Sequence, residues 1–366
     1  MKYNWQSEEW PVFKVDLSGM QDLLSRFSEK TGRVDGLLTA LPDSLKTDAI
    51  IDLMVSEAMK TSEIEGEMLS RPDVMSLIRN NLGLQPESQP SGDFRAQGIA
   101  ELMVGIRNTY PNPISQRMLF DWHTMLMKGA RRVNAGAWRT HSEPMLVVSG
   151  SIDREQIHYE APPSEMVPAE MKRFVRWFNQ SAPGKKTGSL PPPVRSAMAH
   201  VYFESIHPFE DGNGRIGRAL SEKALSQGLG RPVLLSLSKA INADRAGYYD
   251  ALKNAQRSMD LSDWVDWFIR TLLQAQEQAE VEIEFTLKKV KLFDRVREQV
   301  NERQLKVIQR MLKEGPEGFI GGMSAQKYMA IARTSKSTAT RDLQDLVAKN
   351  ILILTGGGRS TRYQID

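Results

Sequence analysis

Apolar residues return every three or four positions along most of the chain, which is the spacing of a helix face rather than of a strand. In residues 50–65 such a face is followed by Gly66, a residue that often ends helices. Its members are Ile50, Met54, Ala58, Thr61 and Glu65. Further helical patterns cover 95–108, 114–128, 165–180, 194–206, 214–227, 245–257 and 261–300. The face predicted for 194–206 consists of Val194, Ala197, Met198, Val201 and Ser205. These patterns predict a mainly α-helical protein.

Three stretches interrupt the helical pattern. Residues 83–93 and 180–193 are rich in Pro, Ser and Gly and are predicted to be loops. The second loop comes just before the helix that leads to His207. Residues 144–163 combine β-branched residues, a Ser-Gly-Ser turn and a Pro pair, which predicts a short β-hairpin.

The last 66 residues differ in character from the rest of the chain. Three short helical patterns are followed by two strand patterns with a Gly-rich turn between them, which is the order of a winged helix-turn-helix. Ser335 is predicted to cap the third helix, whose first turns would present Lys336, Thr338 and Arg341.

The basic residues concentrate in this C-terminal segment. From residue 301 on there are 11 Lys and Arg against 6 Asp and Glu, a balance of +5, so the chain's net +3 leaves −2 for residues 1–300. DNA and a protein are both candidate partners of the segment. With DNA, Arg359 and Arg362 in the wing would contact phosphates.

Composition excludes several kinds of chemistry. The chain has no Cys, so disulfides, thiolate nucleophiles and Cys-ligated zinc are ruled out. Its apolar runs are too short to cross a bilayer, and the N-terminus lacks the pattern of a signal peptide. A cytoplasmic protein without a membrane partner is expected. His123, His141, His158 and His200 lack metal-ligand spacing, and a structural role is favoured for each.

The stretch HPFEDGNGRIGR, residues 207–218, concentrates the candidate chemistry. Its glycines suit a loop running into a helix N-terminus, where backbone amides and the helix dipole favour a phosphate. Arg215 and Arg218 are three apart and could hold further phosphate oxygens. Asp211 suits Mg²⁺, which takes one or two carboxylates together with substrate phosphates. The imidazole of His207 can accept a hydroxyl proton near neutrality.

This stretch resembles the signature HPFx(D/E)GNGRxxR of Fic-domain proteins, most of which transfer AMP from ATP to a protein hydroxyl. The resemblance implies a Fic-type helical core in which His207 is the general base and Asp211 binds Mg²⁺ or Mn²⁺. The nucleotide-binding motif residues it implies are Asp211, Gly212, Asn213, Gly214, Arg215, Ile216, Gly217 and Arg218. The predicted hairpin would be the family's flap, with Ile157, His158, Tyr159 and Glu160 nearest the nucleotide. Tyr248, Tyr249 and Gln256 would lie on the adenine side.

Residues 61–66, TSEIEG, raise a second expectation. Thr61 and Glu65 share a helix face, and Glu65 lies at the negative end of the helix dipole, where it would gain from an arginine partner. The stretch also resembles the inhibitory motif (S/T)xxxE(G/N) of many Fic proteins, which implies that Glu65 pairs with Arg218 and misplaces the γ-phosphate of ATP. The protein would then be of the class with an N-terminal inhibitory helix.

The sequence therefore predicts four segments: an N-terminal helical domain (1–85), a Fic core (86–280), a helical linker (281–300) and a winged helix-turn-helix (301–366). The expected activity is transfer of AMP from ATP to an unidentified target protein and to the chain itself. A hydrolase that removes AMP with Glu65, a relative that moves another phosphate-linked group, and a nucleotide-sensing DNA-binding regulator are the alternatives. Formation of a homo-oligomer stays open.

Overall fold

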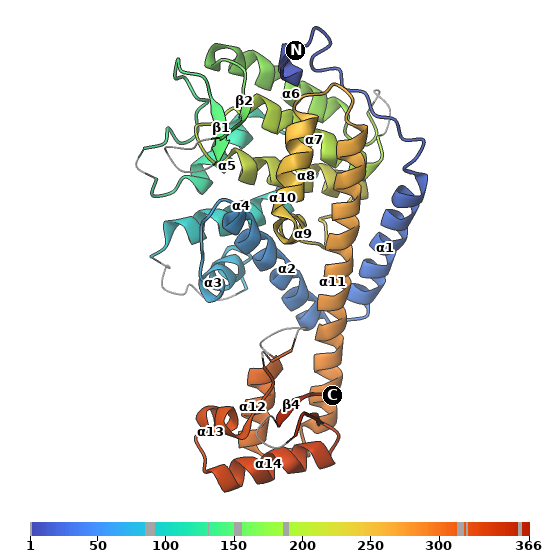
Figure 1. Cartoon of the computed structure of the whole chain (residues 1–366), viewed down its shortest axis with the longest axis vertical. Helices are drawn as coiled ribbons and strands as arrows, with labels where there is room; N and C mark the ends of the chain where they lie inside the picture. Colours follow the sequence, from blue (N-terminus) through green and yellow to red (C-terminus); the bar gives the residue numbers. More distant parts are fainter. Residues whose placement is uncertain are drawn as a thin grey trace. The chain divides into compact units, whose positions relative to one another are not determined.

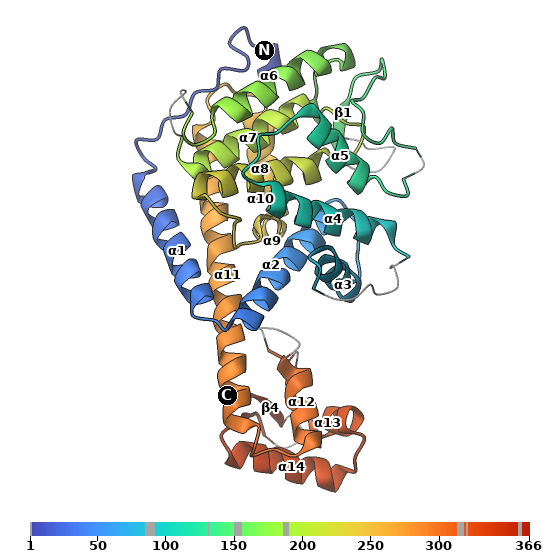
Figure 2. The same cartoon turned by 180° about the vertical axis from the view of Figure 1, so that it is seen from behind.

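The computed structural model describes residues 2–84, 92–130, 132–149, 156–185, 190–312, 318–319, 321–357 and 361–366, with backbone alone for 148, 149, 156 and 157. Within these ranges the chain forms fourteen α-helices and two small β-hairpins (Figure 1; Figure 2 shows the view from behind). The prediction of a mainly α-helical fold is confirmed.

The helices lie at the predicted patterns, except that those at 21–39, 71–81 and 237–243 were not individually predicted and that the helix predicted from residue 50 begins at residue 43. They are α1 (Gln21–Thr39), α2 (Asp43–Ile64), α3 (Arg71–Asn81), α4 (Phe94–Thr109), α5 (Gln116–Leu126), α6 (Val167–Gln180), α7 (Pro192–Ile206), α8 (Asn213–Leu229), α9 (Leu237–Ala243), α10 (Arg245–Ala255), α11 (Ser262–Val296), α12 (Glu302–Leu312), α13 (Ala325–Ala332) and α14 (Lys336–Ala348). Two short 3₁₀ helices are η1 (Asn4–Gln6) and η2 (Ser164–Met166). The strands are β1 (Leu146–Ser149), β2 (Gln156–Glu160), β3 (Leu352–Thr355) and β4 (Arg362–Ile365).

The chain divides into two compact units. Residues 1–35 and 50–279 form the first unit, and residues 36–49 with 280–366 form the second. The predicted boundary between residues 85 and 86 lies inside the first unit. The residues that carry the candidate motif and those of the predicted brake therefore belong to one compact unit.

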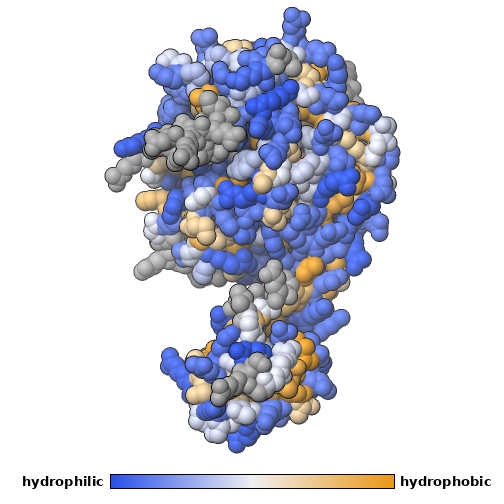
Figure 3. Space-filling view, in the orientation of Figure 1, coloured by the Kyte–Doolittle hydropathy of each residue, from blue (hydrophilic) through white to orange (hydrophobic). Residues whose placement is uncertain are grey.

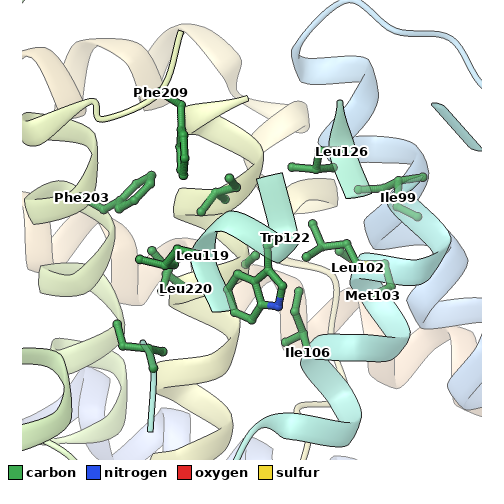
Figure 4. Close-up of a cluster of buried hydrophobic side chains, with 14 of the residues drawn as sticks. Ile99, Leu102, Met103, Ile106, Leu119, Trp122, Leu126, Phe203, Phe209 and Leu220 are labelled. Carbon is green, nitrogen blue, oxygen red and sulfur yellow. The ribbon is translucent and has the colours of Figure 1, made fainter. Parts of the chain in front are cut away.

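Helix α7 is the centre of the first unit. It begins with the pair Pro192–Pro193, which is tolerated in a first helical turn because the amide is not needed there. Every side chain from Pro193 to Ile206 is buried, whereas the sequence predicted burial of one face only. The reason is that neighbouring elements, α8 above all, cover α7 on every side. Figure 4 shows part of this core, with Phe203 of α7 near Leu119 of α5 and Leu220 of α8, and with Trp122 of α5 between them and the side chains of α4.

Both hairpins are antiparallel pairs. In the first unit β1 pairs with β2, which confirms the hairpin predicted in 144–163. The pairing has a register shift between Val147 and Val148. In the second unit α12, α13 and α14 precede the pair β3–β4 and share a buried core with Leu292, Val296 and Tyr363. The predicted order of three helices and a hairpin is confirmed, and the assignment to the winged helix-turn-helix class stays a prediction.

Apolar residues make up the smaller part of one face of the molecule. The face in Figure 3 is coloured mostly hydrophilic, with apolar residues scattered across it. Among the described residues, no helix combines the length and apolar character that a bilayer crossing requires.

Candidate functional site

His207 ends α7 in the left-handed conformation, with φ of 49° and ψ of 60°. This conformation is unfavourable for residues other than glycine, so the surroundings must hold it. The His207 amide donates to Phe203 O (2.9 Å), and Arg139 Nε donates to His207 O (2.8 Å). Burial lowers the pKa of Arg139 to about 10, so this side chain stays a cation at neutral pH. The turn at His207 is thus fixed from both sides.

The loop that follows is braced by Asn213 and His123. The Asn213 side chain accepts from Phe209 N and donates to Phe209 O, both at 2.9 Å. His123 of α5 accepts from Gly136 N at Nδ1 (3.0 Å), so its Nε2 carries the proton and donates to Asp211 O (3.2 Å). Burial lowers the pKa of His123 to about 4, which keeps the ring neutral in this role. The predicted structural role of His123 is therefore specific: it supports the motif loop.

Helix α8 opens an anion site at its N-terminus. Gly212, the N-cap, has φ of 78°, and a Cβ there would lie 2.9 Å from Met127 Cε. Ile216 N is bonded back to Gly212 O (3.1 Å), so the amides of residues 213–215 lie in the open first turn. About half a positive charge resides there. A phosphate group fits this position.

Asp211 stands at the rim of the same site. Its carboxylate is 61% exposed, accepts a hydrogen bond from Gly212 N (2.5 Å) and lies 3.7 Å from Arg215 Nη2. Among the described residues no cluster of three acidic or histidine side chains forms a complete metal site. The donor chemistry nevertheless fits Mg²⁺ or Mn²⁺, because one carboxylate together with substrate phosphates is a usual ligand set for Mg²⁺.

Arg218, one turn into α8, is buried against the end of α2. Its Nη2 donates to Glu65 Oε1 (2.7 Å) and Thr61 O (3.1 Å), and its Nε donates to Thr61 Oγ1 (2.7 Å). Burial alone would lower the pKa of Arg218, but the charge of Glu65, followed by Tyr248 and Glu204, holds it above the ordinary value. The contact between Glu65 and Arg218 that the resemblance implied is therefore present. The inhibitory effect of this contact stays a prediction.

The backbone at the end of α2 explains why Glu65 is followed by glycine. Gly66 has φ of 81°, Gly66 N donates to Glu63 O (3.0 Å), and Glu67 N donates to Ser62 O (2.9 Å). These two bonds and the left-handed glycine define a Schellman motif, in which a residue with a side chain would be strained at the glycine position. The motif reverses the chain so that acidic residues flank Gly66.

Both acidic residues contact arginines of the candidate motif. Glu65 Oε1 lies so close to the first turn of α8 that a Cβ on Gly214 would collide with it. Glu67 Oε2 lies 2.8 Å from Arg215 Nη1. A carboxylate thus lies against the anion site, and each motif arginine is already paired with a carboxylate.

The hairpin is fastened near the end of α7 by the N-terminal segment. Tyr159 of β2 is buried, and its hydroxyl donates to Ser205 O (2.7 Å). Asn4 Nδ2 donates to Ser205 Oγ (2.9 Å), and Trp5 Nε1 donates to Glu160 O (2.8 Å). The backbone carbonyl of His158 accepts from Arg257 Nη2 (3.0 Å). The side chain of Ile157, also predicted for the flap, lies outside the described residues.

The three predicted adenine-side residues differ in their surroundings. Tyr248 is buried, and its hydroxyl bonds to His200 Nε2 (2.8 Å). Gln256 is also buried; its side-chain Nε2 donates to Glu204 O (3.1 Å), and its backbone carbonyl accepts from Asn4 N (2.8 Å). Tyr249 is 43% exposed, with its ring centroid 5.1 Å from that of Tyr248.

Comparisons with known proteins identify a family for the central part of the chain. Residues 113–225 match the model of the Fic/DOC family. The chain carries a Fic domain. Residues 3–84 match a domain of unknown function, DUF4172. The Fic domain thus contains His207, the motif arginines and the hairpin, whereas Glu65 belongs to the segment before it.

Curated relatives of the Fic domain are adenylyltransferases. The chain is 32% identical over 196 residues to the protein adenylyltransferase Fic of Drosophila ananassae, covering 53% of this chain and 35% of that protein. The Drosophila melanogaster protein of the same name gives 32% over 193 residues, covering 52% of this chain and 35% of the relative. The matches span about a third of these relatives' length.

Solved structures share the fold. A Fic family protein from Desulfovibrio desulfuricans G20 superimposes with a TM-score of 0.57 at 20% identity, over 97% of this chain and 98% of that one. A Fic domain containing signaling protein from Bacteroides thetaiotaomicron gives 0.53 at 18% identity, over 73% of this chain and 97% of that one.

The candidate DNA contacts lie in the second unit, apart from the Fic domain in sequence. Ser335 caps α14 by accepting from Thr338 N (3.3 Å), as predicted, and leaves Lys336 and Arg341 exposed. Arg362 is half-buried and donates to Thr361 O (2.8 Å). Arg359 lies outside the described residues. Binding of DNA and binding of a protein partner by this segment both stay predictions.

Several residues around the Fic site carry no signal in the sequence. Asn4, Arg139 and Arg245 stand alone among residues of other kinds, and their partners are far away in the chain. Glu67 was also missed, although it is a second acid just beyond the helix-ending Gly66 and its partner Arg215 belongs to the motif.

Proposed function

We propose that this protein is an adenylyltransferase that transfers AMP from ATP to a hydroxyl group of a target protein and of itself, and that its own α2 restrains it. The observation that carries the proposal is the arrangement of His207, the open first turn of α8 and the paired motif arginines around one site. The names of the Drosophila relatives support the same reaction class.

In the proposed reaction His207 accepts the proton of the attacking hydroxyl. The hydroxyl oxygen forms a bond to the α-phosphorus of ATP as the bond to the β-phosphate's bridging oxygen breaks, and pyrophosphate leaves. The amides of residues 213–215 and the α8 dipole would stabilise charge that develops on the phosphates. Arg215 and Arg218 would hold the outer phosphates once their carboxylate partners are displaced.

Asp211 would hold Mg²⁺ or Mn²⁺ together with the phosphates. When bound, the metal would neutralise phosphate charge and orient the leaving group. The exposure of the Asp211 carboxylate and its place beside the α8 N-terminus support this role.

Glu65 would act as the restraint. Its carboxylate lies against Gly214 and pairs with Arg218, where a phosphate of ATP would otherwise bind. An anion that occupies the site in the absence of ATP must be displaced before ATP can bind productively.

The decisive experiment uses the Glu65→Gly variant, labelled ATP and intact-mass measurement. Self-modification by the mass of one AMP is expected, and adding His207→Ala should abolish it while ATP binding is retained. Transfer that survives His207→Ala would refute the base assignment. A different added mass would indicate another transferred group, and net removal of AMP from a modified target would favour the hydrolase.

A further inference from the structure

Glu204 is a buried acid one turn before His207. Its Oε2 lies 3.5 Å from His207 Nδ1, and the two side chains are 6% and 14% exposed. Among the described residues, neither His207 Nδ1 nor Glu204 Oε1 has a hydrogen-bond partner. The pair is therefore close but slightly longer than a normal hydrogen bond.

The carboxylate of Glu204 is ionised despite its burial. Burial alone would raise its pKa, but His207 first, and also the charge of Arg218, lower it below the ordinary value. A buried carboxylate needs a proton donor to compensate for lost hydration. His200 cannot serve as that donor, because its two nitrogens face Ser221 Oγ and Tyr248 OH. Arg218 already donates to Thr61 and Glu65.

Helix α8 makes room for this acid at Gly217, a position that the Fic signature leaves unspecified. A Cβ on Gly217 would collide with Glu204 Oε1 where the carboxylate lies in this structure. The end of α7 is held in place by Gln256, which donates to Glu204 O (3.1 Å), and by Asn4, which donates to Ser205 Oγ (2.9 Å). Gln256, predicted on the adenine side, thus fixes the backbone of the acid.

The charged and titratable groups around the pair come from every neighbouring element. They are His200 on α7, Arg218 on α8, Tyr248 on α10, Tyr159 on β2, Glu65 at the end of α2, and Arg139 on the segment before the hairpin. Both tyrosines are kept neutral because burial raises the pKa of each well above its ordinary value. His200 is also neutral, since burial lowers its pKa to about 4.

We infer that Glu204 is a positioning residue for His207. Its carboxylate accepts a hydrogen bond from Nδ1–H of His207, so that the unprotonated Nε2 faces the substrate, and it stabilises the imidazolium that forms when Nε2 takes up a proton. The catalytic half of this inference rests on the proposed function, whereas the choice of tautomer does not. An acid behind the base is a general device for fixing tautomer and orientation.

The tautomer can be tested on the full chain without nucleotide or metal. Nitrogen chemical shifts of ¹⁵N-histidine-labelled protein, recorded well above the ordinary imidazole pKa of about 6.5, report which ring nitrogen is protonated. We expect Nδ1–H for His207. His123 is the reference in the same spectrum, since Gly136 N donates to its Nδ1 and leaves the proton on Nε2. The His207→Ala spectrum assigns the signal.

Two variants distinguish the role of Glu204 as a hydrogen-bond acceptor from the role of its negative charge. Glu204→Met keeps the length of the side chain but has no acceptor oxygen, so His207 should shift its proton to Nε2. Glu204→Gln keeps an acceptor and should retain Nδ1–H. An Nε2–H tautomer in the wild-type protein, or Nδ1–H that persists in Glu204→Met, would overturn the inference. If Glu204→Met does not fold, the wild-type measurement still decides it.

A rate measurement tests the catalytic half. In the Glu65→Gly background, Glu204→Gln should lower kcat at least about tenfold and leave ATP affinity unchanged. An unchanged kcat would overturn this half. Absence of any AMP transfer would refute the proposed function and leave the tautomer result standing.

Discussion

Replacing Glu65 by glycine removes the carboxylate that lies against the first turn of α8. The substitution breaks the 2.7 Å contact between Glu65 Oε1 and Arg218 Nη2. Arg218 keeps its bonds to Thr61 O and Thr61 Oγ1, at 3.1 and 2.7 Å, so its side chain stays oriented. A glycine is tolerated here because Glu65 follows the last residue of α2.

The size of the effect follows from the contact that is lost. A hydrogen bond between charged groups contributes about 1.5–3 kcal/mol. The Glu65 side chain is 32% exposed, so solvent screening places it in the lower part of this range, at about 2 kcal/mol. Each 1.4 kcal/mol corresponds to a factor of ten, so apparent ATP affinity should rise roughly thirtyfold once no carboxylate must be displaced.

Titration calorimetry with ATP and Mg²⁺ measures this change directly. The experiment uses the His207→Ala background, where ATP is not consumed. Glu63→Ala is the matched control, because Glu63 lies on the same helix but contacts Lys60 (2.6 Å) and Asn242 (3.2 Å). ATP affinity that changes less than about threefold in Glu65→Gly, or changes equally in Glu63→Ala, would refute the restraint.

Three further outcomes are expected. Glu67→Gln should strengthen ATP binding severalfold by freeing Arg215, from which Glu67 Oε2 lies 2.8 Å away, and calorimetry that shows no change would contradict it. Burial lowers the pKa of His123 and of His200 to about 4, so the folded state binds fewer protons than the unfolded chain between about pH 4 and 6.5. The free energy of unfolding should therefore fall by about 3 kcal/mol for each histidine as the pH drops through that window. Scanning calorimetry should show this loss as a falling thermal midpoint. Asn4→Ala should lower the midpoint by a few degrees through loss of about 1–2 kcal/mol at Ser205, and an unchanged midpoint would argue against the fastening of the hairpin.

Local signals made most of the fold predictable. The periodicity of 194–206 and 214–227 gave α7 and α8 because each side chain's place on a helix depends only on nearby sequence. The complete burial of α7 could not be read from the same pattern, since its polar residues find partners far along the chain. Arg195, for example, donates to Phe178 O (2.7 Å) and Ala224 O (3.0 Å).

The candidate site also combines local contacts, which the sequence predicts, with long-range contacts, which it does not. The motif loop was predictable because the partners of Asn213 and Gly212 lie within four residues. The pair of Glu65 and Arg218 was predicted only through resemblance to a family pattern. Contacts such as Asn4 with Ser205, 201 residues apart, leave no periodicity or spacing in a single sequence.

Docking of α2 and blocking of the anion site are separable in this architecture. The last carbonyls of α2 have no partners within a helix, and arginines supply them: Arg218 donates to Thr61 O (3.1 Å) and Arg245 donates to Ile64 O (2.6 Å). These bonds involve backbone atoms, so they persist when the Glu65 side chain is removed. The Schellman turn at Gly66 then only determines where the two carboxylates point. Removal of the Glu65 carboxylate alone should therefore leave α2 docked, whereas release of α2 would break both arginine-to-carbonyl bonds as well.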